Sequence, residues 1–316
     1  MRLPAFSSAR RILLATACIA ALSAAVACGD GDKSKDDSSK GDGVPFEAVI
    51  TSADIAVGKQ RFAFVLLKDN KPIREHDVTV RFFRLKDPQN PQLLGEGVIP
   101  WSPIGATDPA DDHAHGSHDE TELDGVYYAN LEFPEAGQWG AGFTLGSKAD
   151  PEKEVRVSFE VRPKTQTLGV GDRGIPVDNP TLATRPLKQI DTSPVPDEAM
   201  HKLSITDALK NGKPTLIAFA TPAFCASRTC GPTMAVVRAA QEKYGSRVNF
   251  LHIEPYELDA DGNLLGNKLQ PVAAGTAWRL PSEPWVFILD SKGVVAARMD
   301  GPVSLEEVDA YLDHLQ

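Results

Sequence analysis

The stretch TLIAFATPAFCASRTCGP, residues 215–232, places two cysteines five positions apart shortly after a continuous apolar run. Such a run, TLIAFA (215–220), is typical of a strand buried on both faces of a sheet. In a straight helix, Cys225 and Cys230 would stand about 7.5 Å apart along the axis, too far for a disulfide. Pro232 suits the first turn of a helix. We therefore expect either a loop over 225–230 that brings the sulfurs together, or local unwinding on oxidation.

The residues on both sides of this stretch alternate between helix and strand signals from Leu203 onward. Ser204 with Asp207, and Ser304 with Glu307, have the spacing of helix-capping boxes. Gly245 marks the end of a helix. The pattern predicts an α/β domain over 203–316, with strands at 215–220, 248–254, 285–290 and 294–300 and helices near 205–211, 232–244, 270–279 and 305–316.

The preceding region, 46–163, has a different character, because its segments are short, rich in β-branched and aromatic residues, and separated by turns. Along 77–85, Val78, Val80 and Phe82 alternate with polar residues, as in a strand with one buried face. No helix-period segment interrupts, and a long loop is expected over 86–122. The region predicts an antiparallel β-sandwich with strands at 61–67, 77–85, 125–133, 137–145 and 155–161. Residues 164–202 are expected to be a linker.

The first residues have the pattern of an export signal. Three arginines precede an apolar run of 16 residues (12–27), which is short for a membrane span. The run ends in Ala-Val-Ala-Cys, which resembles a bacterial lipobox. The resemblance implies a signal peptide over 1–27, a lipid on Cys28, and a location in the cell envelope facing the periplasm or the exterior. Residues 28–45 contain almost no hydrophobic side chains and predict a disordered tether.

The net charge and the cysteine content of the chain limit the classes of function that it can have. The chain carries 33 basic and 43 acidic residues, for a formal charge of −10, and loss of the leader with its three arginines makes it −13. This acidity argues against nucleic-acid partners. Of the four cysteines, Cys18 leaves with the leader and Cys28 would be lipidated. Cys225 and Cys230 then carry the remaining thiols. In an oxidising compartment these two thiols are expected to form a disulfide.

The order of strands, helices and cysteines over 203–316 resembles the thioredoxin fold. Pro284, directly before the strand at 285–290, stands where that family has a cis-proline, so a cis Glu283–Pro284 bond is expected. The resemblance implies that Cys225 is the attacking thiolate, with Arg228 as a nearby cation, and that Cys230 is the resolving cysteine. It implies a protein thiol or disulfide as partner and no cofactor. The C-x4-C spacing replaces the usual C-x-x-C. In the first domain, the run at 125–139 resembles a hairpin of immunoglobulin-like periplasmic domains.

Two alternative functions remain open at this stage. Residues 221–230 also resemble peroxiredoxins of the bacterioferritin-comigratory type, with one extra residue between Pro222 and Cys225; this implies a peroxidase. The other alternative is a non-catalytic binding module, in which a thioredoxin-type scaffold is locked by a static disulfide.

Histidines and acidic residues offer two further candidate sites. His113, His115 and His118, in the loop DDHAHGSHDE (111–120), have side chains that bind Zn²⁺ or Cu²⁺, so the loop is a candidate divalent-metal site. In the second domain, His252 is the one histidine expected in the core. It shares a strand face with Glu254, and either side chain would serve as proton acceptor if it pointed toward the sulfurs.

Overall fold

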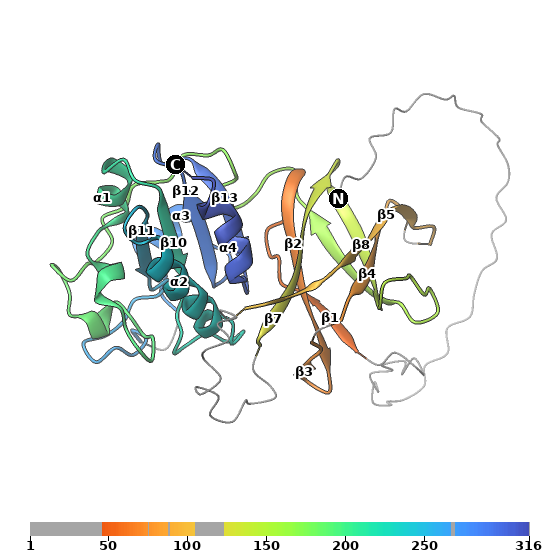
Figure 1. Cartoon of the computed structure of the whole chain (residues 1–316), viewed down its shortest axis with the longest axis horizontal. Helices are drawn as coiled ribbons and strands as arrows, with labels where there is room; N and C mark the ends of the chain where they lie inside the picture. The colour runs from red at the N-terminus through yellow and green to blue at the C-terminus, as the bar shows by residue number, and fades with distance from the viewer. Residues whose placement is uncertain (1–45, 75, 88, 105–122, 267–268, 316) are drawn as a thin grey trace, which may run out of the picture.

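Figure 1 shows the computed structural model of the chain, which describes residues 46–315 except 75, 88, 105–122 and 267–268. The expected signal peptide, the lipid site at Cys28, the tether and the three loop histidines lie outside the described residues. The described chain forms three sheets, two in an N-terminal lobe and one in a C-terminal lobe with the helices. Within this described part, no helix is long and apolar enough to cross a membrane.

The N-terminal lobe consists of two antiparallel sheets with strand orders β1-β2-β7-β6 and β5-β4-β8-β9, and β3 adds to β2. The strands expected from the sequence appear within a few residues of their expected bounds. The bounds are β1 (Glu47–Ile50), β2 (Gly58–Lys68), β3 (Lys71–Pro72), β4 (Val78–Arg84), β5 (Gln92–Ile99), β6 (Trp101–Pro103), β7 (Gly125–Phe133), β8 (Gly137–Leu145) and β9 (Val155–Val161).

The two sheets face each other across one aromatic-rich core. Alternate residues of β2, Phe62 and Phe64, point into this core. Phe62 meets Phe82 of β4 with ring centroids 5.1 Å apart, and Phe64 meets Phe143 of β8 at 4.7 Å. Burial of such large side chains is the main stabilising contribution to the lobe.

One expectation for this lobe is wrong. The long loop expected over 86–122 contains two strands, β5 and β6, before the part outside the described residues begins. β5 is an edge strand that pairs with β4 alone, and most of its side chains are exposed or half-buried. Its two glycines, Gly95 and Gly97, and its lack of a buried face remove the alternation that marks a strand in a sequence.

The C-terminal lobe contains a four-stranded sheet in the order β11-β10-β12-β13. β10 and β11 are parallel, whereas the β10–β12 and β12–β13 pairs are antiparallel. The elements are η1 (Leu187–Gln189), η2 (Glu198–His201), α1 (Ile205–Lys210), β10 (Thr215–Phe219), α2 (Cys230–Tyr244), β11 (Asn249–Ile253), α3 (Ala273–Trp278), β12 (Trp285–Leu289), β13 (Val295–Asp300) and α4 (Leu305–Leu312).

Helices cover both faces of this sheet, and successive side chains of β10 point alternately toward one face and the other. Leu216 and Ala218 of β10 pack with residues of α2 and α4, whereas Ile217 and Phe219 pack with residues of α1 and α3. All five residues of β10 are buried, which explains its unbroken apolar run. The expected caps are confirmed, because the hydroxyls of Ser204 and Ser304 accept hydrogen bonds from the third residue beyond them.

The two lobes are joined by buried ion pairs as well as by apolar contacts. Arg61 points out of the sandwich from β2, and its guanidinium donates to both carboxylate oxygens of Glu307 in α4, at 2.6 and 2.9 Å. It also donates to the carbonyls of Asp300 and Pro302. In a second ion pair between the lobes, Arg298 of β13 contacts the Asp54 carboxylate at 3.1 Å. Ala63 and Val126 of the sandwich are part of the core cluster around α2 and α4.

The segment 164–202, expected as a linker, has little regular structure but packs closely against the C-terminal lobe. Leu168 belongs to the core on the α1–α3 side. Arg173 forms a bridge with Val294, and Asn179 caps the backbone of Ile205 at 2.7 Å. The segment therefore contributes side chains to the C-terminal lobe, and three of its residues, Asp191, Thr192 and His201, enter the candidate site.

Candidate functional site

Cys225 and Cys230 form a disulfide in which their Cα atoms are 6.0 Å apart. Cys225 lies in the irregular turn after β10, and Cys230 is the first residue of α2. The loop expected over 225–230 is therefore present, and the helix begins beyond Cys225. Cys225 is half-buried, whereas Cys230 is 0% exposed. Cys225 is therefore the more exposed residue of the pair.

The polar contacts of Cys225 come from the turn itself. The Cys230 amide donates toward the Cys225 sulfur at 3.3 Å, and the Ser227 hydroxyl lies 3.2 Å from the same sulfur. Amides at a helix N-terminus stabilise negative charge, so this position suits a thiolate. Arg228 has a left-handed backbone (φ 57°), and its amide donates to the Cys225 carbonyl at 3.2 Å. Its side chain is exposed, so its expected role as a cation near the sulfur stays a prediction.

The strand register brings three candidate residues to one end of the sheet. Phe219, the last residue of β10, pairs with Trp285 in β12 and with Ile253 in β11. The turn toward Cys225 therefore leaves the sheet where Pro284 enters it and where Glu254 follows β11. The Glu283–Pro284 bond is cis, as expected.

Glu254 is buried and is connected to the cysteine turn through Thr192. The Glu254 carboxylate accepts hydrogen bonds from the Thr192 amide, at 2.8 Å, and from the Thr192 hydroxyl. The same hydroxyl accepts from the amide of Ala223, two residues before Cys225, at 3.3 Å. Burial raises the pKa of Glu254 above its ordinary value. The segment 164–202 thus fixes both the acid and the turn.

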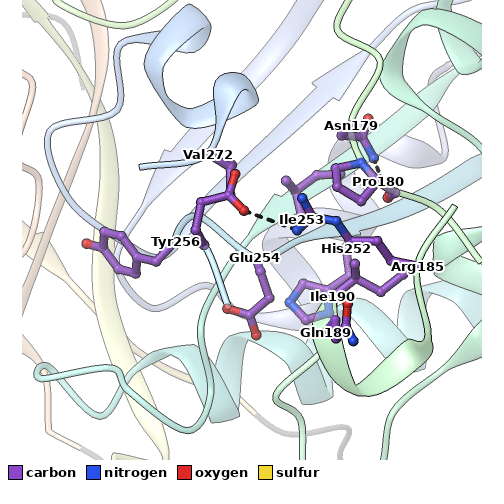
Figure 2. A pocket seen from close by; sticks show the side chains of 11 residues that line it. Asn179, Pro180, Arg185, Gln189, Ile190, His252, Ile253, Glu254, Tyr256 and Val272 are labelled. Carbon is purple, nitrogen blue, oxygen red and sulfur yellow. Dashed lines mark hydrogen bonds and ion pairs between the residues drawn. The ribbon is translucent and has the colours of Figure 1, made fainter. Parts of the chain in front are cut away.

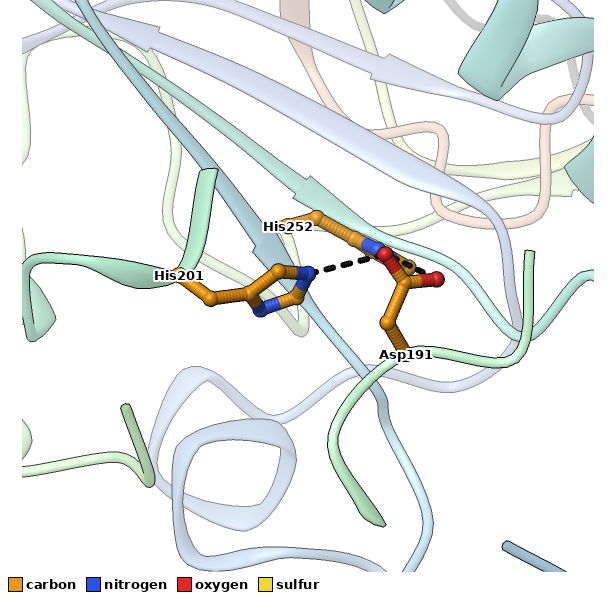
Figure 3. A group of neighbouring side chains, drawn as sticks. All are labelled: Asp191, His201 and His252. Atoms are coloured by element: carbon orange, nitrogen blue, oxygen red, sulfur yellow. Dashed lines mark hydrogen bonds and ion pairs between the residues drawn. The ribbon is translucent and has the colours of Figure 1, made fainter. Parts of the chain in front are cut away.

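A second cluster lies beside this connection. In Figure 3, His201 from η2 and His252 from β11 both turn toward the carboxylate of Asp191. His201 Nε2 is 3.0 Å from Asp191 Oδ2, and His252 Nδ1 is 3.5 Å from Asp191 Oδ1. The other nitrogen of His252, Nε2, lies 2.9 Å from the carbonyl oxygen of Ala220, where β10 has just ended. All three side chains are buried.

The electrostatics of the cluster follow from this mutual contact. Burial favours the neutral forms, but the neighbouring carboxylate raises the pKa of His252 above its ordinary value. Burial likewise opposes ionisation of Asp191, yet its interactions with His201 and His252 hold its pKa below the ordinary value. The cluster therefore favours a negative Asp191 facing positive charge.

Sequence reasoning missed most of this cluster. His252 was expected to be the one histidine in the core of the domain, and this is wrong because His201 is buried beside it, with ring centroids 5.2 Å apart. Asp191, Thr192 and His201 all lie in the segment interpreted as a linker. That segment has neither helical nor strand periodicity, so no pattern in it indicated burial.

His252 also lines a small cavity, and Figure 2 shows the residues that surround it. Its volume is about 20 Å³, and His252, Glu254 and Arg185 are among the residues that line it. This volume is enough for one water molecule. It is far below that of a pocket for an organic substrate. No family model matches the chain, and no curated protein matches it.

Proposed function

We propose that the chain is an exported, lipid-anchored thiol-disulfide oxidoreductase that exchanges disulfides through Cys225 and Cys230. The observation that carries the proposal is the difference in burial within the pair. An exchange reaction needs one sulfur that a partner can reach and a second that is protected from it. The half-buried Cys225 and the fully buried Cys230 meet these requirements.

The reaction begins from the disulfide that the pair already forms. A partner thiolate attacks the accessible sulfur of Cys225, the Cys225–Cys230 bond breaks, and Cys230 leaves as a thiolate. A second thiol of the partner, after losing its proton, attacks the mixed disulfide and releases Cys225. The partner dithiol is oxidised by two electrons, the cysteine pair is reduced, and two protons are transferred. The same steps in reverse reduce a partner disulfide.

The architecture of the C-terminal lobe supports a thioredoxin-like interpretation. Its sheet combines a parallel β10–β11 pair with antiparallel β12 and β13, and helices cover both faces. The cysteines follow the central strand β10, and Pro284 precedes the adjacent β12 at the same end. Backbone groups beside Pro284 would pair with an extended peptide of the partner protein.

The N-terminal lobe and the residues before it would support and anchor the C-terminal lobe. The N-terminal lobe, with its two facing antiparallel sheets, would be an immunoglobulin-like domain that holds the redox lobe through the Arg61 and Asp54 ion pairs. The expected lipid on Cys28 would fix the protein to a bacterial membrane, facing the periplasm or the exterior. The acidic tether would let it reach partner proteins.

The direct experiment measures catalysed exchange. The purified full chain is incubated with glutathione and a fluorescence-quenched peptide dimer joined by a disulfide. We expect the wild type to accelerate cleavage of the dimer over glutathione alone. Cys225→Ser removes the attacking sulfur and abolishes the acceleration. Cys230→Ser stalls at a mixed disulfide that mass spectrometry detects on Cys225.

The matched control is Ser291→Ala, in the turn between β12 and β13 far from the cysteines along the chain, which should keep the full rate. Circular dichroism checks that each variant is folded. A folded wild type that is no faster than glutathione alone, or a Cys225→Ser variant that keeps the acceleration, would refute the proposal. Fast oxidation of Cys225 by peroxide instead, with formation of a sulfenic acid, would favour the peroxidase alternative.

A further inference from the structure

We propose that Asp191, His201 and His252 bind a divalent transition-metal ion, with the donor set that Zn²⁺ prefers. The three potential ligand atoms lie within 4.8 Å of one another, and all three residues are buried. Imidazole nitrogen and carboxylate oxygen are common Zn²⁺ ligands. These three residues are different from the histidines of the loop over 111–120, and their proposed role does not depend on exchange chemistry at the cysteines.

The tautomer of His252 is fixed by its contact with the backbone. Its Nε2 lies 2.9 Å from the Ala220 carbonyl oxygen, and because a carbonyl only accepts, Nε2 must carry a proton. The other nitrogen, Nδ1, therefore faces Asp191 either as a bare lone pair or with a second proton. A bare lone pair against a carboxylate is repulsive, so a positive group is needed between these two atoms.

The geometry favours a metal ion over a proton as that positive group. A charge-assisted N–H···O bond is about 2.7–2.9 Å long. The distance between His252 Nδ1 and Asp191 Oδ1 is 3.5 Å, and Nδ1 makes no hydrogen bond although its side chain is 0% exposed. Two ligands of a tetrahedral Zn²⁺ ion stand about 3.4 Å apart, given metal–ligand bonds of about 2.0–2.1 Å. An ion would draw the two imidazoles closer to each other.

The neighbours of the three residues have the pattern that surrounds a metal site. A histidine ligand commonly donates its second N–H to a backbone carbonyl, which holds the ring in place. His252 does this through Ala220. A carboxylate ligand is commonly held by hydrogen bonds as well, and Asp191 accepts from the amides of Ser193, at 2.7 Å, and Asp197, at 3.3 Å. The three donors leave the fourth position of a tetrahedral shell to water.

An ion bound at this position would connect parts of the chain that support the cysteine turn. It would connect η2 and the chain around Asp191 to β11, whose neighbour β10 continues into the cysteine turn. Thr192, the residue after Asp191, holds both Glu254 and the Ala223 amide. A bound ion would therefore stiffen the support of the cysteine turn without contacting either sulfur.

The test measures metal binding to the purified full chain with its disulfide intact, so that thiols do not compete. Zn²⁺ is titrated against a chromophoric chelator, and Co²⁺ is added separately as a spectroscopic probe. We expect one Zn²⁺ equivalent that survives His113→Ala/His115→Ala/His118→Ala and weakens by more than about 100-fold in His201→Gln/His252→Gln. In His252→Gln the side-chain amide keeps an N–H donor for the Ala220 carbonyl. Bound Co²⁺ should give the visible spectrum of a four-coordinate nitrogen–oxygen site.

Equal Zn²⁺ affinity of the wild type and the folded double glutamine variant would overturn the proposal, as would loss of the equivalent in the loop variant. If the double variant does not fold, His201→Gln alone decides, because it leaves the contact between His252 and the Ala220 carbonyl in place. Added Zn²⁺ should also raise the Tm of the loop variant, and it should do so much less after His201→Gln. A Tm that Zn²⁺ leaves unchanged would contradict a folded-state site.

Discussion

The disulfide between Cys225 and Cys230 joins a half-buried residue to a fully buried one. The asymmetry arises because α2 begins at Cys230, which turns this residue into the core beneath the helix, while Cys225 stays in the turn. It predicts unequal reactivity of the two single-cysteine variants.

In Cys230→Ser the remaining thiol at position 225 should react with iodoacetamide at least about tenfold faster than the thiol at 230 in Cys225→Ser, because reactivity follows access and thiolate character. Mass spectrometry of timed samples under native conditions measures both rates. The same two variants in denaturant are the control, since unfolding should make the rates similar. Equal native rates would mean that the turn does not distinguish the two sulfurs.

The hydroxyl of Thr192 couples a buried acid to the cysteine turn. Thr192→Val keeps the shape of the side chain but removes the two hydrogen bonds of the hydroxyl, to Glu254 and to Ala223, while the Thr192 amide still donates to Glu254. We expect the free energy of unfolding to fall by about 1–3 kcal/mol, because the carboxylate loses a partner. Hydrogen exchange of the Ala223 amide should become faster. The control is Thr165→Val, because the Thr165 hydroxyl donates to the nearby Thr167 carbonyl and does not contact the cysteine turn. Unchanged exchange at Ala223 would contradict the coupling.

The Arg61–Glu307 pair holds the lobes together. Arg61→Met leaves the Glu307 carboxylate, whose side chain is 3% exposed, without its cation. Removing one partner of a buried pair typically costs about 3–5 kcal/mol. Denaturant unfolding measures this loss, and Arg61→Met/Glu307→Leu should recover much of it because the Glu307 carboxylate no longer lies buried without its cation. A double variant as unstable as the single one would show that the charge pair is not what couples the lobes.

The stability of the sandwich should depend on pH through Glu154. Burial works to raise its pKa, but hydrogen bonds from Arg81 and Arg156 hold the pKa below its ordinary value. A carboxyl with a lowered folded-state pKa stabilises the protein above its ordinary pKa, and the effect is lost as the pH falls through the folded value. At pH 7 the Tm of the wild type should therefore exceed that of Glu154→Gln by about 2–4 °C.

The same comparison near pH 3 should give a smaller difference. The control is Glu152→Gln, an exposed residue in the turn before β9, which should show little change at either pH. A difference between wild type and Glu154→Gln that stays constant from pH 7 to pH 3 would contradict this assignment.

The sequence predicted the elements with strong local signals. The apolar run before Cys225 marked β10, and Ser204 and Ser304 marked the starts of α1 and α4. The cis bond before Pro284 was predicted by a family resemblance and is present. The edge strand β5 was missed because its glycines and its largely exposed side chains give no alternation of apolar and polar residues.

The surroundings of the cysteines could not be predicted, because they depend on contacts between residues far apart in the chain. Asp191, Thr192 and His201 lie in a stretch without periodicity. Asp191 and His201 are buried and Thr192 is half-buried because they pack against β11 and Glu254. Arg61 likewise resembles an ordinary outward-facing strand residue until the C-terminal lobe covers it. Such partners become visible only when the tertiary structure is known.

The reduction potential of the Cys225–Cys230 disulfide distinguishes a working redox centre from a structural cross-link. The full chain is equilibrated in graded thiol/disulfide buffers, alkylated, and analysed by mass spectrometry. A potential between about −120 and −270 mV, the range of working oxidoreductases, is the predicted result. A value below about −300 mV would identify a structural disulfide and contradict the account.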